Sequence, residues 1–126
     1  MNTELRVALY NRAKDATGLT GGLWYVEAPQ SSVYPYAVFS FVNNPFSRDS
    51  ASKFEEYYLQ INIYSDSEAE IETVKDNLIA LLDDSESNYT LTSWYFDRIE
   101  REFAIPRKLD DIFQISIQYR IELTKK

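Results

Sequence analysis

Two stretches in which apolar and polar residues alternate constrain this chain more than any other feature. The first runs from Phe54 to Tyr64 and the second from Ile112 to Leu123. Successive side chains of a β-strand point to opposite faces of its sheet, so each stretch predicts a long strand with one apolar face. The apolar face of the second strand consists of Phe113, Ile115, Ile117, Tyr119, Ile121 and Leu123. The chain must therefore build a sheet that is covered on one side.

Two segments predict the helices that cover this side. From Thr3 to Ala16 the apolar residues recur every three or four positions, which predicts a helix that Gly18 ends. Residues 65–84 predict a second helix with a clear apolar stripe, which begins in a capping box at either Ser65 or Ser67.

Three further strands complete the predicted sheet. They are expected at Leu23 to Glu27, at Tyr36 to Val42, and within Thr90 to Ile105. In the last of these the alternation slips near Trp94, which predicts a bulge or bend, and Pro106 is expected to end the strand. The order of elements predicts one α+β domain over residues 1–126, with a four- to five-stranded, mostly antiparallel or mixed sheet and both helices on one face.

Composition excludes several classes of function. The net charge of −7 disfavours binding to phosphate backbones, which depends on clustered Lys and Arg. Neither Cys nor His occurs, so disulfides, structural zinc sites and His-based triads are excluded. No apolar run approaches the length of a membrane span and the first residues do not resemble a signal peptide, so we expect a cytosolic chain without membrane contact.

The remaining chemical motifs do not predict a catalytic, cofactor or metal site. The adjacent acids Glu55-Glu56, Asp83-Asp84 and Asp110-Asp111 point to opposite strand faces or lie in turns, so we expect solvated charges. The segment "GLTGG" lacks the Lys-Ser/Thr pair of a phosphate-binding loop and precedes a strand where that loop precedes a helix. The expected class is therefore a protein without enzymatic activity.

The sheet face opposite the helices raises the question of what covers it. Two helices of about four turns cover one side of such a sheet and leave the second side open. That side is predicted to carry neutral polar residues and tyrosines, with few charges at its centre: Tyr36, Val38, Tyr58, Gln60, Asn62, Tyr64, Gln114, Ser116 and Gln118. Tyr enrichment and charge depletion are typical of protein interfaces. The alternative is a solvated antiparallel face.

The succession of features from Leu9 to Ile121 resembles the tail completion or tail terminator proteins of long-tailed phages and prophages, also called head-tail joining proteins. The residues that carry the resemblance are "LYNRAKDATGLTGGLWYVEAPQSSVYPYAVFSF", "YYLQINIYSDSEAEIETVKDNLIALLDD" and "FQISIQYRIEL". Residues 84–108 match no part of the family pattern.

The resemblance implies a structural protein of the virion, assembled in the cytoplasm of a bacterial host. It implies a homo-oligomeric ring, of six subunits, at the head-proximal end of the tail tube. The ring would end polymerisation of the tail tube protein and dock onto a head-completion or neck protein. DNA would pass through an acidic bore without specific binding.

Nine residues are expected at the interfaces of such an assembly. They are Tyr36, Val38, Tyr58, Gln60, Tyr64, Gln114 and Gln118 on the sheet, with Phe46 and Arg48 in the long connection from Asn43 to Lys53. Two alternatives remain open at this point. A well-formed apolar pocket would favour a ligand-binding α+β module, and a deep pocket that gathers several carboxylates around a metal would favour a small hydrolase.

Overall fold

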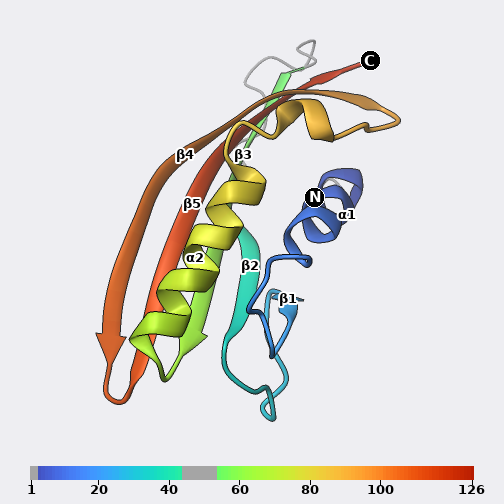
Figure 1. Cartoon of the computed structure of the whole chain (residues 1–126). Helices are drawn as coiled ribbons and strands as arrows, with labels where there is room; N and C mark the ends of the chain where they lie inside the picture. Colours follow the sequence, from blue (N-terminus) through green and yellow to red (C-terminus); the bar gives the residue numbers. More distant parts are fainter. Residues whose placement is uncertain (1–2, 44–53) are drawn as a thin grey trace.

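The structure is a computed structural model that describes residues 3–43 and 54–126 (Figure 1). Within these ranges it contains two α-helices, one short 3-10 helix and a five-stranded sheet. The elements are α1 (Thr3–Ala13), β1 (Leu23–Tyr25), β2 (Tyr36–Asn43), β3 (Phe54–Ser65), α2 (Glu68–Leu82), η1 (Glu86–Asn88), β4 (Trp94–Leu109) and β5 (Ile112–Lys125). The predicted α+β class and the order of its elements are confirmed.

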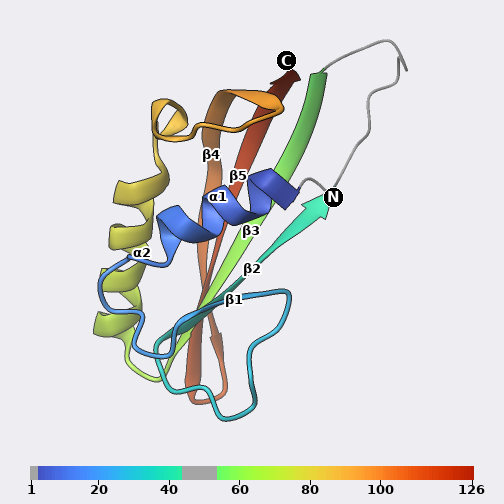
Figure 2. The same cartoon turned by 90° about the vertical axis from the view of Figure 1, so that its right-hand side faces the viewer.

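The sheet is open and mixed, with the strand order β1-β2-β3-β5-β4. Strand β1 runs parallel to β2, and the other three pairings are antiparallel. The two strands with the clearest alternation, β3 and β5, pair in the middle, where Ile61 lies opposite Ile117. Strands β1 and β4 therefore form two different edges, on opposite sides of the molecule (Figures 1 and 2).

Both helices lie on the concave side of the curved sheet (Figures 1 and 2). Helix α2 packs against β3, β5 and α1. The ring of Tyr10 on α1 stacks with the ring of Phe39 on β2, with 6.3 Å between centroids. The buried hydrophobic residues of the helices and central strands are Leu5, Leu9, Ala13, Ile71, Val74, Leu78, Leu82, Tyr57, Leu59, Ile61, Ile63, Ile115, Ile117, Tyr119, Ile121 and Leu123. One apolar core thus forms on one face of the sheet.

The predicted end of the fourth strand is wrong. Strand β4 continues past Pro106 to Leu109, and Pro106 lies opposite Ile115 of β5. A proline fits here because β4 is an edge strand. On the solvent side of such a strand, the missing N–H removes no hydrogen bond to a neighbouring strand. The predicted irregularity near Trp94 is confirmed by a register shift between Phe96 and Arg98, and a second shift follows further along the strand.

Two other boundaries differ from the pattern, and the start of α2 decides between the two predicted caps. Helix α1 ends at Ala13, earlier than predicted, and a single turn continues the chain because the Ala16 N–H donates to the Ala13 carbonyl at 3.1 Å. Strand β1 stops at Tyr25, because Val26 has a φ of 70°, outside the extended region. Of the two predicted caps, Ser67 is the N-cap of α2: its Oγ accepts from the Glu70 N–H at 3.3 Å, and its own N–H donates to Ser65 Oγ at 3.1 Å.

No helix within residues 3–43 and 54–126 is long and apolar enough to cross a membrane.

We predict that Gly21→Ala destabilises the fold by about 1–3 kcal/mol, the usual cost of overpacking a filled site. A Cβ at Gly21 would lie 1.8 Å from the Val33 carbonyl oxygen and 2.9 Å from Tyr36 Cβ. The backbone of the loop before β2 would have to move. Urea unfolding measures the change, with the exposed Ser87→Ala as the control. An unfolding midpoint equal to that of the wild type would contradict the observed close approach.

Candidate functional site

The sheet face opposite the helices, called the outer face below, brings together seven of the nine predicted interface residues. Tyr36, Tyr64 and Gln114 lie in one row across β2, β3 and β5. Gln60 and Gln118 lie directly opposite each other. All seven side chains are half-buried: Tyr36, Val38, Tyr58, Gln60, Tyr64, Gln114 and Gln118. Phe46 and Arg48 lie outside the described residues.

One end of the outer face is a stack of tyrosines. The Tyr34 and Tyr36 ring centroids are 5.8 Å apart, and the Tyr36 and Tyr64 centroids are 5.1 Å apart. Burial raises the pKa of the Tyr36 hydroxyl, and the neighbouring Tyr34 and Tyr64 raise it further. Sequence reasoning missed Tyr34, which precedes the strand and joins the stack only through the turn into β2. Stacked rings of this kind offer a large, rigid contact area to a partner.

The centre of the outer face is a neutral hydrogen-bonded cluster. Ser116 Oγ donates to Asn62 Oδ1 at 2.7 Å, and Gln60 Nε2 donates to the same oxygen at 3.3 Å. Gln114 Nε2 lies 3.4 Å from Ser116 Oγ. These contacts hold the side chains in place without a formal charge. A partner that covers this region has no charge to desolvate.

The other end of the outer face is charged. Glu100 of β4 pairs with Arg98 at 2.8 Å and with Arg120 of β5 at 3.1 Å. Tyr58 Oη donates to Glu56 at 2.8 Å, and this hydrogen bond raises the pKa of Tyr58. Sequence reasoning did not place the β4 charges here, because the two bulges break the alternation of that strand. Exposed pairs of this type contribute up to about 1 kcal/mol each, so they serve solubility more than stability.

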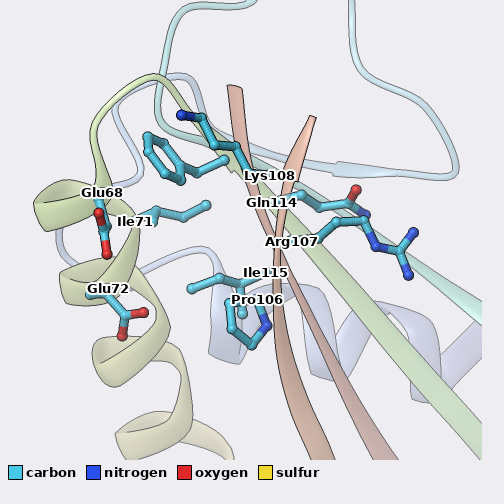
Figure 3. A pocket seen from close by; sticks show the side chains of 9 residues that line it. Glu68, Ile71, Glu72, Pro106, Arg107, Lys108, Gln114 and Ile115 are labelled. Atoms are coloured by element: carbon cyan, nitrogen blue, oxygen red, sulfur yellow. The ribbon is translucent and has the colours of Figure 1, made fainter. Parts of the chain in front are cut away.

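A shallow groove of about 230 Å³ lies between α2 and the hairpin of β4 and β5. Ile71 and Ile115 point into it, whereas Arg107 and Gln114 point away from α2, toward the outer face (Figure 3). The Lys108 ammonium caps the Phe113 ring at 5.5 Å from its centroid. Neighbouring residues of this hairpin thus point to opposite faces of the sheet (Figure 3).

The acidic residues that follow α2 line a cavity of about 470 Å³. Arginines on β4 neutralise two of its carboxylates, with Arg101 3.3 Å from Asp83 and Arg98 2.8 Å from Glu100. Tyr119 Oη also donates to Asp83, at 2.7 Å. Within the described ranges, no group of three acidic side chains is placed to hold a metal ion. The contacts of Asp83 with Arg101 and Tyr119 join the end of α2 to the sheet and so stabilise the fold.

The fold defines a class of α+β proteins in which two helices cover one face of an open, mixed five-stranded sheet. Within this class, the chain belongs to the family "Tail completion protein gp17", whose sequence profile matches residues 5–122. It is thus a structural protein of phage tails and a component of the virion. The resemblance inferred from the sequence is confirmed.

Two solved structures share the fold over nearly the whole chain. A protein from the virion of a native gene transfer agent particle is 14% identical, with a TM-score of 0.70 and coverage of 95% of this chain and 94% of that one. A second protein, which has no descriptive name, is 18% identical with a TM-score of 0.62, covering 98% and 94%. No curated protein matches the chain.

We predict that the stability of the protein falls above about pH 10, the ordinary pKa of tyrosine, and that Tyr119→Phe reduces this loss. Burial raises the pKa of Tyr119 and its hydrogen bond to Asp83 raises it further. In alkaline solution the unfolded chain therefore releases this proton first, and the stabilisation present below about pH 10 is lost as the pH rises.

Urea unfolding of the wild type and of Tyr119→Phe, between about pH 8 and about pH 11, separates this residue from the other tyrosines, which titrate in both proteins. The variant is expected to lose about 1.5–3 kcal/mol at pH 8, where it lacks the hydrogen bond to the Asp83 carboxylate. Its free energy of unfolding should then decline less steeply with pH. If the free energy of unfolding declined equally steeply with pH in the two proteins, Tyr119 would not be a cause of the alkaline loss of stability.

Proposed function

We propose that copies of this chain form a ring, of six subunits, that caps the head-proximal end of a phage tail tube. The ring stops polymerisation of the tube protein and docks onto the head-completion or neck protein. The observation that carries the proposal is the family match over residues 5–122, together with a well-ordered outer face that the chain's own helices leave open.

Two features of the molecule support a ring. The open sheet has two unlike edges, β1 and β4, and a head-to-tail contact joins two unlike patches and closes into a ring when the rotation allows. A half-buried outer face supplies a further surface, for the tube or the neck. The relative from the gene transfer agent virion also belongs to a particle, which agrees with a place in an assembled virion.

The charge of the chain suits the passage of DNA. Each copy carries −7, so a ring of six carries about six times that charge. An acidic ring repels the phosphate backbone and lets DNA slide through without specific binding. The role is structural, without catalysis or a cofactor, and assembly takes place in the cytoplasm of the bacterial host.

The first test is tail length. In a phage or prophage whose gene for this protein is deleted, we expect overlong tails that are not joined to heads, because nothing ends the growth of the tube. Electron microscopy of lysates measures tail length and the fraction of joined particles. Restoring the gene on a plasmid should return both to normal. Tails of normal length joined to heads in the deletion strain would overturn the proposal.

The second test addresses the outer face. We predict that Gln60→Arg lowers the yield of joined particles at least about tenfold, since an unpaired charge in a buried contact costs more than about 1.4 kcal/mol. Gln60 lies in the centre of the face, opposite Gln118, and its side chain donates to the neutral Asn62 at 3.3 Å. The control is Ser87→Arg, an equal change of charge at an exposed residue of η1. Unfolding midpoints should match the wild type for both variants, and equal particle yields would remove the outer face from the assembly.

A further inference from the structure

One arginine of the outer face has no partner within the described part of the chain. Of the six arginines in residues 3–43 and 54–126, five make an ion pair, a hydrogen bond or a ring contact: Arg6, Arg12, Arg98, Arg101 and Arg120. Arg107 of β4 makes none of these contacts with a described residue, and this includes the turn residues Asp110 and Asp111. Its guanidinium can therefore bind a carboxylate of another molecule.

Arg107 ends a row of side chains that crosses the outer face. It lies opposite Gln114 of β5, Gln114 lies opposite Tyr64 of β3, and Tyr64 lies opposite Tyr36 of β2. The ring of Tyr34 continues the row, because it stacks on Tyr36 with 5.8 Å between the centroids. Figure 3 shows Arg107 and Gln114 on the side of the hairpin that faces away from α2. These five residues are called the arginine–tyrosine row below.

The arginine–tyrosine row contains no acidic residue, which distinguishes it from the charged end of the outer face. At that end Glu100 pairs with both Arg98 and Arg120. The hydroxyls of the three tyrosines in the row donate no hydrogen bond to any described residue. The row thus offers one cation and three hydroxyl donors, and no carboxylate of its own occupies them.

Exposed apolar side chains flank the guanidinium along β4. Ile105 and Leu109 stand two residues before and two residues after Arg107, so the three side chains share one face of the strand. Ile105 is 49% exposed and Leu109 is 45% exposed. Tyr and Arg are enriched among the residues that dominate the binding energy of protein interfaces. A surface with this composition fits a segment that carries both a carboxylate and apolar side chains.

The length of the arginine–tyrosine row limits the segment that it can bind. Neighbouring strands lie about 4.8 Å apart, so the row spans about 14 Å from β4 to β2. This is the length of about four residues of extended chain. A short extended segment is therefore long enough to cover the row.

We propose that the arginine–tyrosine row anchors a short, extended, acidic segment of another tail protein. A carboxylate of this segment accepts from Arg107, and its apolar side chains pack on the tyrosine rings and on Ile105 and Leu109. The inference rests on the proposed function, in which the copies join through the edges of the sheet and the outer face meets the tube or the neck. It adds where on the outer face the partner binds and the chemistry of the segment.

Charge reversal tests the anchor. In Arg107→Glu the carboxylate of the partner would meet a second carboxylate, so we expect at least about tenfold fewer joined particles. The matched control is Lys108→Glu, the same change at the next residue, whose ammonium lies over the Phe113 ring beside α2 (Figure 3). Its particle yield should equal that of the wild type, and both variants should unfold close to the wild-type midpoint.

Two outcomes of the charge reversal would overturn the inference. One is a normal yield of joined particles with Arg107→Glu. The other is an equal loss with both variants, which would indicate a general effect of charge on assembly. The proposed ring function would stand in either case, because deletion of the gene tests it separately.

Zero-length cross-linking identifies the bound segment. Arg107→Lys keeps the cation and supplies a primary amine, which a carbodiimide joins to a carboxylate that is in direct contact. In purified particles of this variant, mass spectrometry should find the new amine linked to an Asp or Glu side chain of another tail protein. The native Lys108, which points to the other face, should not form this link. A link to a second copy of this chain, or no link in particles of normal yield, would overturn the proposal.

Discussion

The pairing of β3 with β5 is the constraint on which the rest of the structure depends. Ile61 faces Ile117 and Ile63 faces Ile115, so the two alternating patterns are in register and give the sheet one continuous apolar face. Helices α1 and α2 cover this face, and the core forms there. The same alternation places every second residue on the other side, where Gln60 meets Gln118 and Asn62 meets Ser116. The outer face is therefore a direct consequence of the strands that build the core.

The surfaces of the molecule divide the tasks of an assembly protein. On the outer face, tyrosine rings stack and neutral polar side chains form hydrogen bonds with one another. Residues 66–86, which contain α2 and its flanks, hold eight of the chain's 20 acidic residues and one of its 13 basic residues, so this acidic segment accounts for the net charge. In the account proposed here, copies of the chain join in a ring and the outer face meets another component of the tail. The acidic segment keeps the copies soluble and repels DNA. In the same account, other virion components cover the outer face that the two helices leave open.

Sequence alone predicted the parts of the fold that are set by local periodicity. Strands β3 and β5 and helix α2 are long, and each buries one clean stripe, so pattern and structure agree. The prediction from sequence failed where contacts between residues far apart in the chain decide the structure. Pro106 lies within β4 because that strand is at an edge, and β1 is parallel to β2 through a loop that no short-range pattern specifies. For the candidate site, alternation placed seven residues on one face, but Tyr34 and the charges of β4 join it only through a turn and two bulges.

The central claim is that the outer face is open in the isolated chain and covered in the virion. Hydroxyl-radical footprinting, read by mass spectrometry, compares the oxidation of individual side chains in the purified protein and in intact particles. The account predicts that Tyr36 and Tyr64 of the outer face are oxidised in the purified protein and strongly protected in particles. Equal oxidation of both tyrosines in the two samples would contradict it.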